Sequence, residues 1–205
     1  MMALGFLSVL SAGLLMGILH AFDPDHVMTM SSLGARPDAR GATARYALSW
    51  GVGHGGILVI AALALLLFDV PMPETLPKGA ERFVGVILIA AGGSLALALW
   101  RSRGGDQPPS SLCSKAPFLI GMVHGTAGSA AVFALLPIGL LSPLLGVLYV
   151  LVFSSGVLIG MMGFGHGSDR VQTLIATQAR TLDKPLRGSV AVLAIGMGSY
   201  WLVGA

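Results

Sequence analysis

The sequence His20-Ala21-Phe22-Asp23-Pro24-Asp25-His26 interrupts an apolar run that extends from about Ala3 to Gly34. Only two of the nine acidic residues lie within hydrophobic segments, and both of them, Asp23 and Asp25, fall in this heptad beside two of the five histidines. An ionisable group at membrane depth costs about 2.5 to 3.5 kcal/mol on insertion scales. A cluster of such groups therefore indicates a functional site.

Pro24 predicts a break in the helix at this heptad. On an unbroken helix His20 and His26 would point about 240° apart and could not close on one ion. Pro24 has no N–H to give the His20 carbonyl, so the helix should end there and the freed carbonyl needs another partner. Asp23 is then the expected N-cap of a second half-helix, with Pro24 at its first position and Asp25 in its first turn. Two imidazoles, two carboxylates and the carbonyl would converge on one point. A simple kink, in which Asp23 only caps, is the alternative.

The composition predicts an all-α polytopic membrane protein. Of the 205 residues, 55% are hydrophobic and 10% are charged, and the mean hydropathy is +0.84. Soluble domains carry about 25% charged residues, and apolar stretches of about 20 residues can cross a bilayer as helices. The net charge of +3 is then a signal of orientation, and we expect no nucleic-acid partner. Cys113 is the only cysteine, which excludes an internal disulfide and a dithiol electron carrier.

Six membrane spans are expected, the first of them broken at the heptad: about 5–34, 43–68, 81–100, 117–139, 143–165 and 188–204. Residues 168–182 could form a short helix on the cytoplasmic surface. Some of the aromatic residues Trp50, Trp100, Tyr149 and Trp201 are candidate interface anchors, although only Trp100 lies clearly at the end of a span.

The basic residues predict the orientation. Ten of the twelve lie between spans one and two, three and four, or five and six. Only Lys78 and Arg82 lie on the opposite side. By the positive-inside rule both termini should be extracytoplasmic, in a cytoplasmic (inner) membrane.

Two halves of the chain resemble each other, with residues 1–103 and 117–205 as three-helix repeats and 104–116 as a cytoplasmic linker. The matches pair Gly17–Ala21 with Gly121–Gly125 at an offset of 104, and Gly51, Gly55, Arg82 and Gly93 with Gly156, Gly160, Arg187 and Gly198 at an offset of 105. Three spans is an odd number, so the second repeat would be inverted, as in many secondary transporters. Chance matches between glycine-rich helices are the alternative.

Three further histidines differ in their surroundings. His54 lies in a glycine-rich span segment without charged residues, where it is either a ligand or an interhelical hydrogen-bonding residue. His124 is the repeat counterpart of His20 and opens a run of small polar residues. His166 falls at the predicted cytoplasmic end of a span, where we expect a solvated helix terminus, with a role in gating as the alternative.

These motifs resemble a known family. The heptad matches the H-x-x-x-x-D-H signature of the nickel/cobalt transporter (NiCoT) family, and Gly53-His54-Gly55 resembles that family's second motif. The stretch from Gly121 to Ala131 looks like the shorter, urease-accessory-type nickel permease branch. The longer members carry acidic residues in the corresponding later span, which this sequence lacks. The resemblance therefore leaves the choice of metal and the direction of transport open.

Together these observations predict a permease for a divalent transition-metal ion, nickel first and cobalt second, and not an enzyme. Imidazole nitrogen suits both metals. The expected ligands are His20, Asp25 and His26, with Asp23 as a ligand or cap and with His54 and His124 completing or supporting the site. The ion is cargo, and no resident cofactor is expected.

Two other functions stay open at this point. One is a secondary transporter of another solute, with the heptad as a proton relay. The other is an intramembrane metalloenzyme, although the chain has no His-Glu-x-x-His pair. Beyond the ion and the lipid bilayer, the resemblance implies metallochaperones or urease and hydrogenase maturation proteins as partners, and it allows an oligomer.

Overall fold

All regular structure that we describe is helical. The computed structural model describes residues 2–34, 43–69, 73, 75–101, 116–127 and 141–204. These residues form α1 (Met2–His20), α2 (Pro24–Gly34), α3 (Thr43–Phe68), α4 (Thr75–Arg101), α6 (Pro117–Thr126), α8 (Pro143–Gln178) and α9 (Arg180–Gly204). The all-α prediction is therefore confirmed for this part of the chain.

The predicted break in the first span is confirmed. Helix α1 ends at His20, α2 begins at Pro24, and the two are bent by 50°. Pro24 is the first residue of α2, where a missing N–H costs nothing. The Asp23 carbonyl accepts the first helical hydrogen bond, from the Val27 N–H at 3.0 Å. Asp23 thus occupies the predicted N-cap position.

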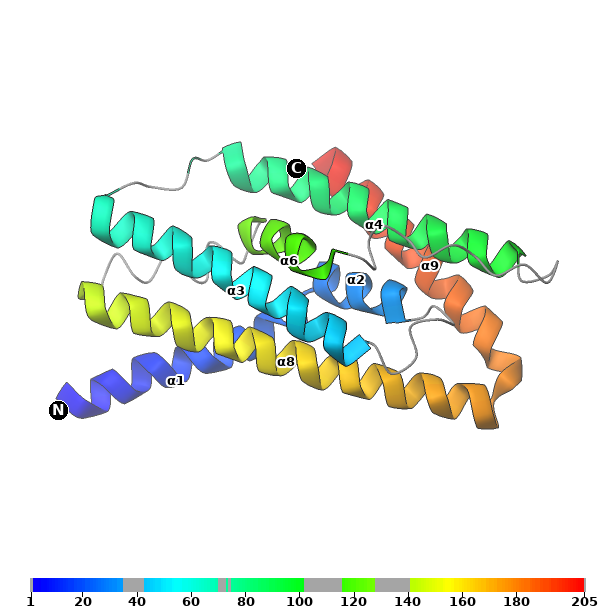
Figure 1. Ribbon diagram of the computed structural model, residues 1–205, viewed down its shortest axis with the longest axis horizontal. Coiled ribbons are helices and arrows are strands. Elements are labelled where there is room, and N and C mark those ends of the chain that lie inside the picture. Colours follow the sequence, from blue (N-terminus) through cyan, green and yellow to red (C-terminus); the bar gives the residue numbers. More distant parts are fainter. Residues whose placement is uncertain are drawn as a thin grey trace.

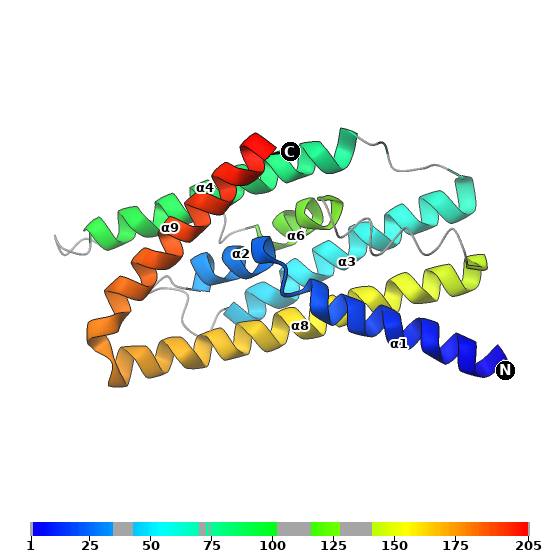
Figure 2. The same cartoon turned by 180° about the vertical axis from the view of Figure 1, so that it is seen from behind.

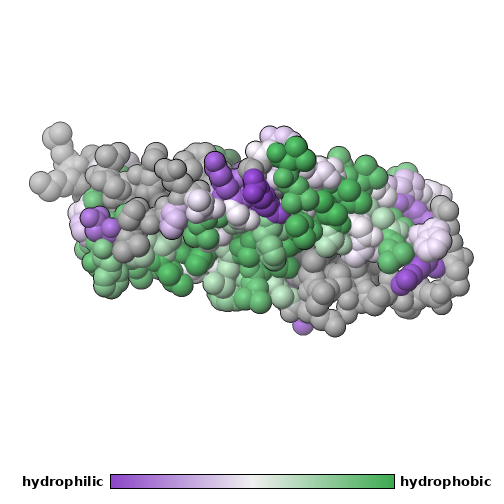
Figure 3. Space-filling view, turned by 90° about the horizontal axis from the view of Figure 1, so that it is seen from above, coloured by the Kyte–Doolittle hydropathy of each residue, from purple (hydrophilic) through white to green (hydrophobic). Residues whose placement is uncertain are grey.

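Several helices are long and apolar enough to cross a bilayer. Helices α3, α4, α8 and α9 each qualify, and the bent pair α1–α2 makes a fifth if it counts as one span. Large apolar side chains such as Leu67, Leu144 and Val192 are exposed, and hydrophobic residues dominate much of the described surface in Figure 3. Of the span expected at 117–139, only α6 and Ala127 are described, and residues 128–139 lie outside the described residues. The count of six spans thus stays a prediction.

The long helices form two pairs with short helices between them. Helix α3 packs along α8, and α4 crosses α9. Helix α1 lies against α8, while α6 lies against α3. The short helices α2 and α6 sit between the α3–α8 pair and the α4–α9 pair in both views (Figures 1 and 2). The broken span therefore delivers α2 to the centre of the molecule.

Glycines allow the closest helix crossings. A methyl group at Gly17 of α1 would overlap the Phe153 carbonyl of α8, and one at Gly121 of α6 would overlap the Trp50 carbonyl of α3. Where α4 crosses α9, Gly85 and Gly198 each face the other's carbonyl oxygen. Because lipid tails are as apolar as the side chains, no hydrophobic effect drives helices together within a membrane, and their association depends on such close packing.

Helix α8 is longer than the sequence predicted. We expected a span ending at residue 165 and a separate surface helix at 168–182, but α8 continues to Gln178 and α9 already starts at Arg180. No proline interrupts residues 166–178, and the Thr173 and Thr177 hydroxyls donate to carbonyls one turn earlier. At 1.5 Å per residue, the 36 residues span about 54 Å, well beyond the roughly 30 Å hydrocarbon core.

Candidate metal centre

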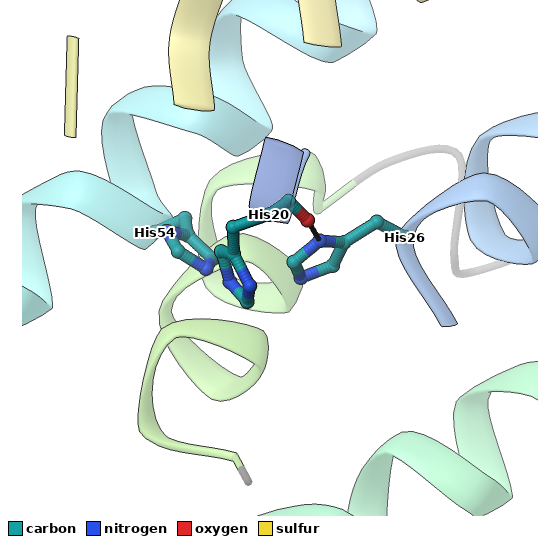
Figure 4. A group of neighbouring side chains, drawn as sticks. All are labelled: His20, His26 and His54. Atoms are coloured by element: carbon teal, nitrogen blue, oxygen red, sulfur yellow. Dashed lines mark hydrogen bonds between the residues drawn. The ribbon is translucent and has the colours of Figure 1, made fainter. Parts of the chain in front are cut away.

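Three histidines from three helices meet at the break. His20 ends α1, His26 lies in the first turn of α2, and His54 lies in the middle of α3. Each is buried, and one ring nitrogen from each lies within 4.8 Å of the other two. Figure 4 shows the three rings turned toward one another. Nitrogen ligands about 2.1 Å from an ion are at most about 4.2 Å apart, so small side-chain rotations would close the cluster on one ion.

The break itself orients His26. The Nδ1–H of His26 donates to the His20 carbonyl at 2.9 Å, and the Asp23 N–H donates to the same oxygen at 3.0 Å. This carbonyl was expected to face the ion, and that expectation was wrong, because both its lone pairs are engaged. A carbonyl only accepts, so His26 carries its proton on Nδ1 and presents the Nε2 lone pair. Metal-binding histidines are commonly oriented by a hydrogen bond of this kind.

The other two histidines have nitrogens without hydrogen-bond partners. Within the described residues neither ring nitrogen of His54 has a partner, although the side chain is fully buried. The same holds for Nε2 of His20. A buried polar group left unsatisfied costs about 1–3 kcal/mol, and such groups are rare in native proteins. These nitrogens are therefore available to a ligand that enters the pocket.

Two carboxylates lie beside the cluster. Asp23 Oδ2 is 2.8 Å from His20 Nδ1, although not in line for a hydrogen bond, and Asp25 Oδ2 is 3.9 Å from His26 Nε2. Both side chains are partly exposed, at 30% and 13%. They supply negative charge that can offset a cation in an apolar setting. The structure thus brings together five of the six predicted site residues, namely His20, Asp23, Asp25, His26 and His54.

His124 adjoins this cluster without joining it. Its ring centroid is 5.7 Å from that of His26, and its Nδ1–H donates to the Ile120 carbonyl at 2.9 Å. Its Nε2 accepts from the Thr29 hydroxyl at 3.1 Å. Thr29 is fully buried on α2, and the sequence reasoning missed it. Its position one turn after Asp25, on the same helix face, was the available signal.

Trp50 is the second residue that the sequence reasoning missed. Its sequence position makes it a candidate interface anchor, but the side chain is completely buried. Its ring lies 4.8 Å from the His26 ring, 5.0 Å from the His54 ring and 5.4 Å from the His124 ring. The spacing of one helical turn before His54 was the signal that could have found it.

His166 is exposed, as predicted, and its Nδ1–H donates to the Met162 carbonyl at 2.9 Å. It lies within the long helix α8 rather than at a helix end. Among the described residues, no contact links it to the cluster.

The donor set is mainly imidazole nitrogen, with carboxylate oxygen beside it. Imidazole suits Zn, Cu, Fe and Ni, whereas Mg and Ca prefer all-oxygen ligands. Cys113 lies outside the described residues. In chemical terms the cluster can hold a first-row divalent ion with three nitrogens and two nearby negative charges.

Comparison with known proteins gives a few distant relatives. The chain is 29% identical over 170 residues to the urease accessory protein UreH of Bacillus sp. (strain TB-90), covering 77% of this chain and 75% of that protein. It is 25% and 26% identical to the chloroplast proteins FOR GROWTH AND FERTILITY 1 and 2 of Arabidopsis thaliana. These matches cover 95% and 91% of this chain but only 58% and 54% of the plant proteins. No model of a protein family matches the chain, and no solved structure matches it.

Proposed function

We propose that this chain is a membrane permease for a divalent transition-metal ion, nickel first and cobalt second. The observation that carries the proposal is the buried convergence of His20, His26 and His54 at a broken helix. Ionisable groups inside an apolar helix bundle are costly and mark transport pathways or relays. The similarity to a protein named as a urease accessory protein agrees with the resemblance of the motifs to the urease-accessory permease branch.

The electrostatics favour inward movement of a cation. Asp23 and Asp25 offset the charge of a divalent ion while it occupies the site. A membrane potential supplies about 2.3 kcal/mol per elementary charge per 100 mV, so a divalent cation gains about twice that on entering the cytoplasm. Uptake through such a site needs no ATP.

Inverted repeats would give this site access to each side in turn. The proposal is supported by two equivalent crossings. In the first crossing, Gly17 of α1 lies against the Phe153 carbonyl of α8, and Gly156 of α8 lies against the Leu14 carbonyl of α1. In the second crossing, Gly121 of α6 lies against the Trp50 carbonyl of α3, and Gly53 of α3 lies against the Phe118 carbonyl of α6. The residue numbers of equivalent positions differ by 104 between α1 and α6 and by 103 between α3 and α8. For α3 and α8 the sequence matches predicted a difference of 105.

Helix directions support the same proposal. Helices α1, α3 and α4 run opposite to α6, α8 and α9, respectively (Figure 1). This is the relation that an inverted repeat requires, and transporters of this kind bind their substrate near the bilayer midplane at broken helices. His124 would then be the counterpart of His20 in the second repeat.

The proposed orientation places both termini outside the cytoplasm, in an inner membrane. The starts of α3 and α9 and the ends of α4 and α8 lie towards one end of the molecule (Figure 1). Near these helix ends lie five of the described basic residues, namely Arg45, Arg101, Arg170, Arg180 and Lys184. Lys78 and Arg82 lie near the start of α4. Basic residues concentrate on the cytoplasmic side of membrane proteins.

Metal binding by the purified protein tests the proposal. We expect about one nickel ion per chain in wild type and in His166→Ala, whose exposed histidine serves as the control. His26→Ala should lose the ion and should also lose nickel uptake in proteoliposomes. A wild-type protein that binds no nickel or cobalt, or a His26→Ala variant that binds as well as wild type, would contradict the proposed function.

A further inference from the structure

One aromatic residue touches histidines of three helices. Trp50 of α3 lies edge-on to His26 of α2, with an interplanar angle of 75°, and edge-on to His124 of α6, with an angle of 65°. It stacks on His54 with an angle of 28°. Because the indole is completely buried against the rings of His26 and His54, it forms an aromatic wall along one side of the three-histidine cluster.

The backbone beneath this wall is fixed. Gly121 of α6 packs so closely on the Trp50 carbonyl that even a methyl group would overlap the oxygen. Trp50 and His54 are one turn apart on the same helix, the spacing at which side chains of a helix meet. The stacking of indole on imidazole is therefore built into α3 and held in place by α6.

His54 needs such a support more than its neighbours do. His26 is oriented by the His20 carbonyl, and His124 by the Ile120 carbonyl. For His54, no hydrogen-bond partner exists among the described residues. A metal-binding histidine usually has its ring orientation fixed by a hydrogen bond from its other nitrogen. Stacking on Trp50 is the contact that can fix the His54 ring in its place.

We propose that Trp50 is a positioning and selectivity residue of the metal site, which orients His54 and closes one side of the pocket to water and to further ligands. The inference rests on the proposed function. An indole offers no lone pair to a metal, so the ion cannot gain a ligand on the side that Trp50 covers. The site should thus hold its ion with few ligands and disfavour ions that keep a full shell of water, such as Mg²⁺.

Cobalt is the probe for this inference, because four-coordinate Co²⁺ absorbs visible light strongly and six-coordinate Co²⁺ only weakly. We would load the full-length wild type and Trp50→Leu with Co²⁺ and record the absorption per bound ion. Trp50→Leu should lose intensity severalfold as water enters, and it should bind cobalt more weakly. Trp50→Phe keeps a flat ring against His54 and should restore most of the wild-type spectrum. Trp201→Leu is the matched control and should leave the spectrum unchanged.

A second measurement does not depend on how Trp50→Leu folds. With Trp100 and Trp201 both replaced by phenylalanine, Trp50 is the only tryptophan left. Its emission should then be quenched in step with the cobalt absorption during a titration. Absence of quenching would overturn the inference, as would a wild-type spectrum in Trp50→Leu or a Trp50→Phe spectrum that matches Trp50→Leu. If wild type binds neither cobalt nor nickel, the proposed function fails as well, whereas normal cobalt binding by wild type with an unchanged Trp50→Leu spectrum removes only the role of Trp50.

Discussion

Replacing Pro24 by alanine should weaken nickel binding by about 10- to 100-fold. Pro24 is the first residue of α2, and the helix bends by 50° just before it. An alanine would bring an N–H within reach of the His20 carbonyl, in the ordinary helical pattern. That donor would compete with the Asp23 N–H and with the His26 ring, which hold the carbonyl at 3.0 and 2.9 Å. The backbone exchanges one hydrogen bond of about 0.5–1.5 kcal/mol for another, but His26 loses the partner that orients it.

The expected loss corresponds to about 1.4 to 2.8 kcal/mol of binding free energy, the usual effect of removing the group that orients a metal-binding histidine. Calorimetric titration of nickel into the purified protein measures it. Pro143→Ala is a matched control, because Pro143 is likewise the first residue of a helix, α8, and lies outside the heptad from His20 to His26. Both variants should insert and fold, since a proline at the first helical position supports no hydrogen bond. If Pro24→Ala binds nickel as tightly as wild type, the break does not orient the site.

Three further predictions concern packing and topology. Thr29→Val should lower the free energy of unfolding by about 1–3 kcal/mol, because it leaves Nε2 of His124 buried without a hydrogen-bond donor. Thr29→Ser keeps the hydroxyl and should preserve the stability, and thermal unfolding in detergent compares the two variants. Gly17→Ala should cost about 1–3 kcal/mol through overlap with α8, whereas Gly93→Ala, which has open space, should be neutral or stabilising. A reporter that is active only in the cytoplasm should be silent when fused after Ala205, and activity there would contradict the inverted repeats.

The break and its two histidines could be predicted because their causes are local. Pro24 removes a defined backbone donor, and Asp23 supplies a defined cap, whatever the rest of the chain does. The 50° bend and the start of α2 at Pro24 confirm this. The hydrogen-bond partner of the His20 carbonyl was predicted only in part. Its need for a new partner was foreseen, but the partner is the ring of His26 and not the ion.

The third histidine, His54, was predicted to complete or support the site, but its meeting with His20 depends on how distant helices pack. His54 reaches His20 because α3 lies against α8 and α6, and no local pattern specifies those contacts. Trp50 was considered only as a candidate interface anchor, since an aromatic residue in a membrane helix is often found at the interface. Only the burial of its ring among three histidines reveals its place.

His124 and the end of α8 show two further limits of sequence patterns. Repeat symmetry pointed to His124, but a buried hydroxyl from α2 takes its Nε2, and a threonine in an apolar helix gives no sign of such a partner. Helix α8 was expected to end where the apolar run ends. Its backbone hydrogen bonds do not require apolar side chains, so it continues to Gln178.

X-ray absorption at the nickel edge tests the central claim most directly. We predict that nickel-loaded wild type shows scattering from three imidazole rings, as the convergence of His20, His26 and His54 requires. The signal should fall by one imidazole in His54→Ala and stay unchanged in His166→Ala. A spectrum with only oxygen ligands, or one that His54→Ala leaves unaltered, would contradict a metal site built by these three helices.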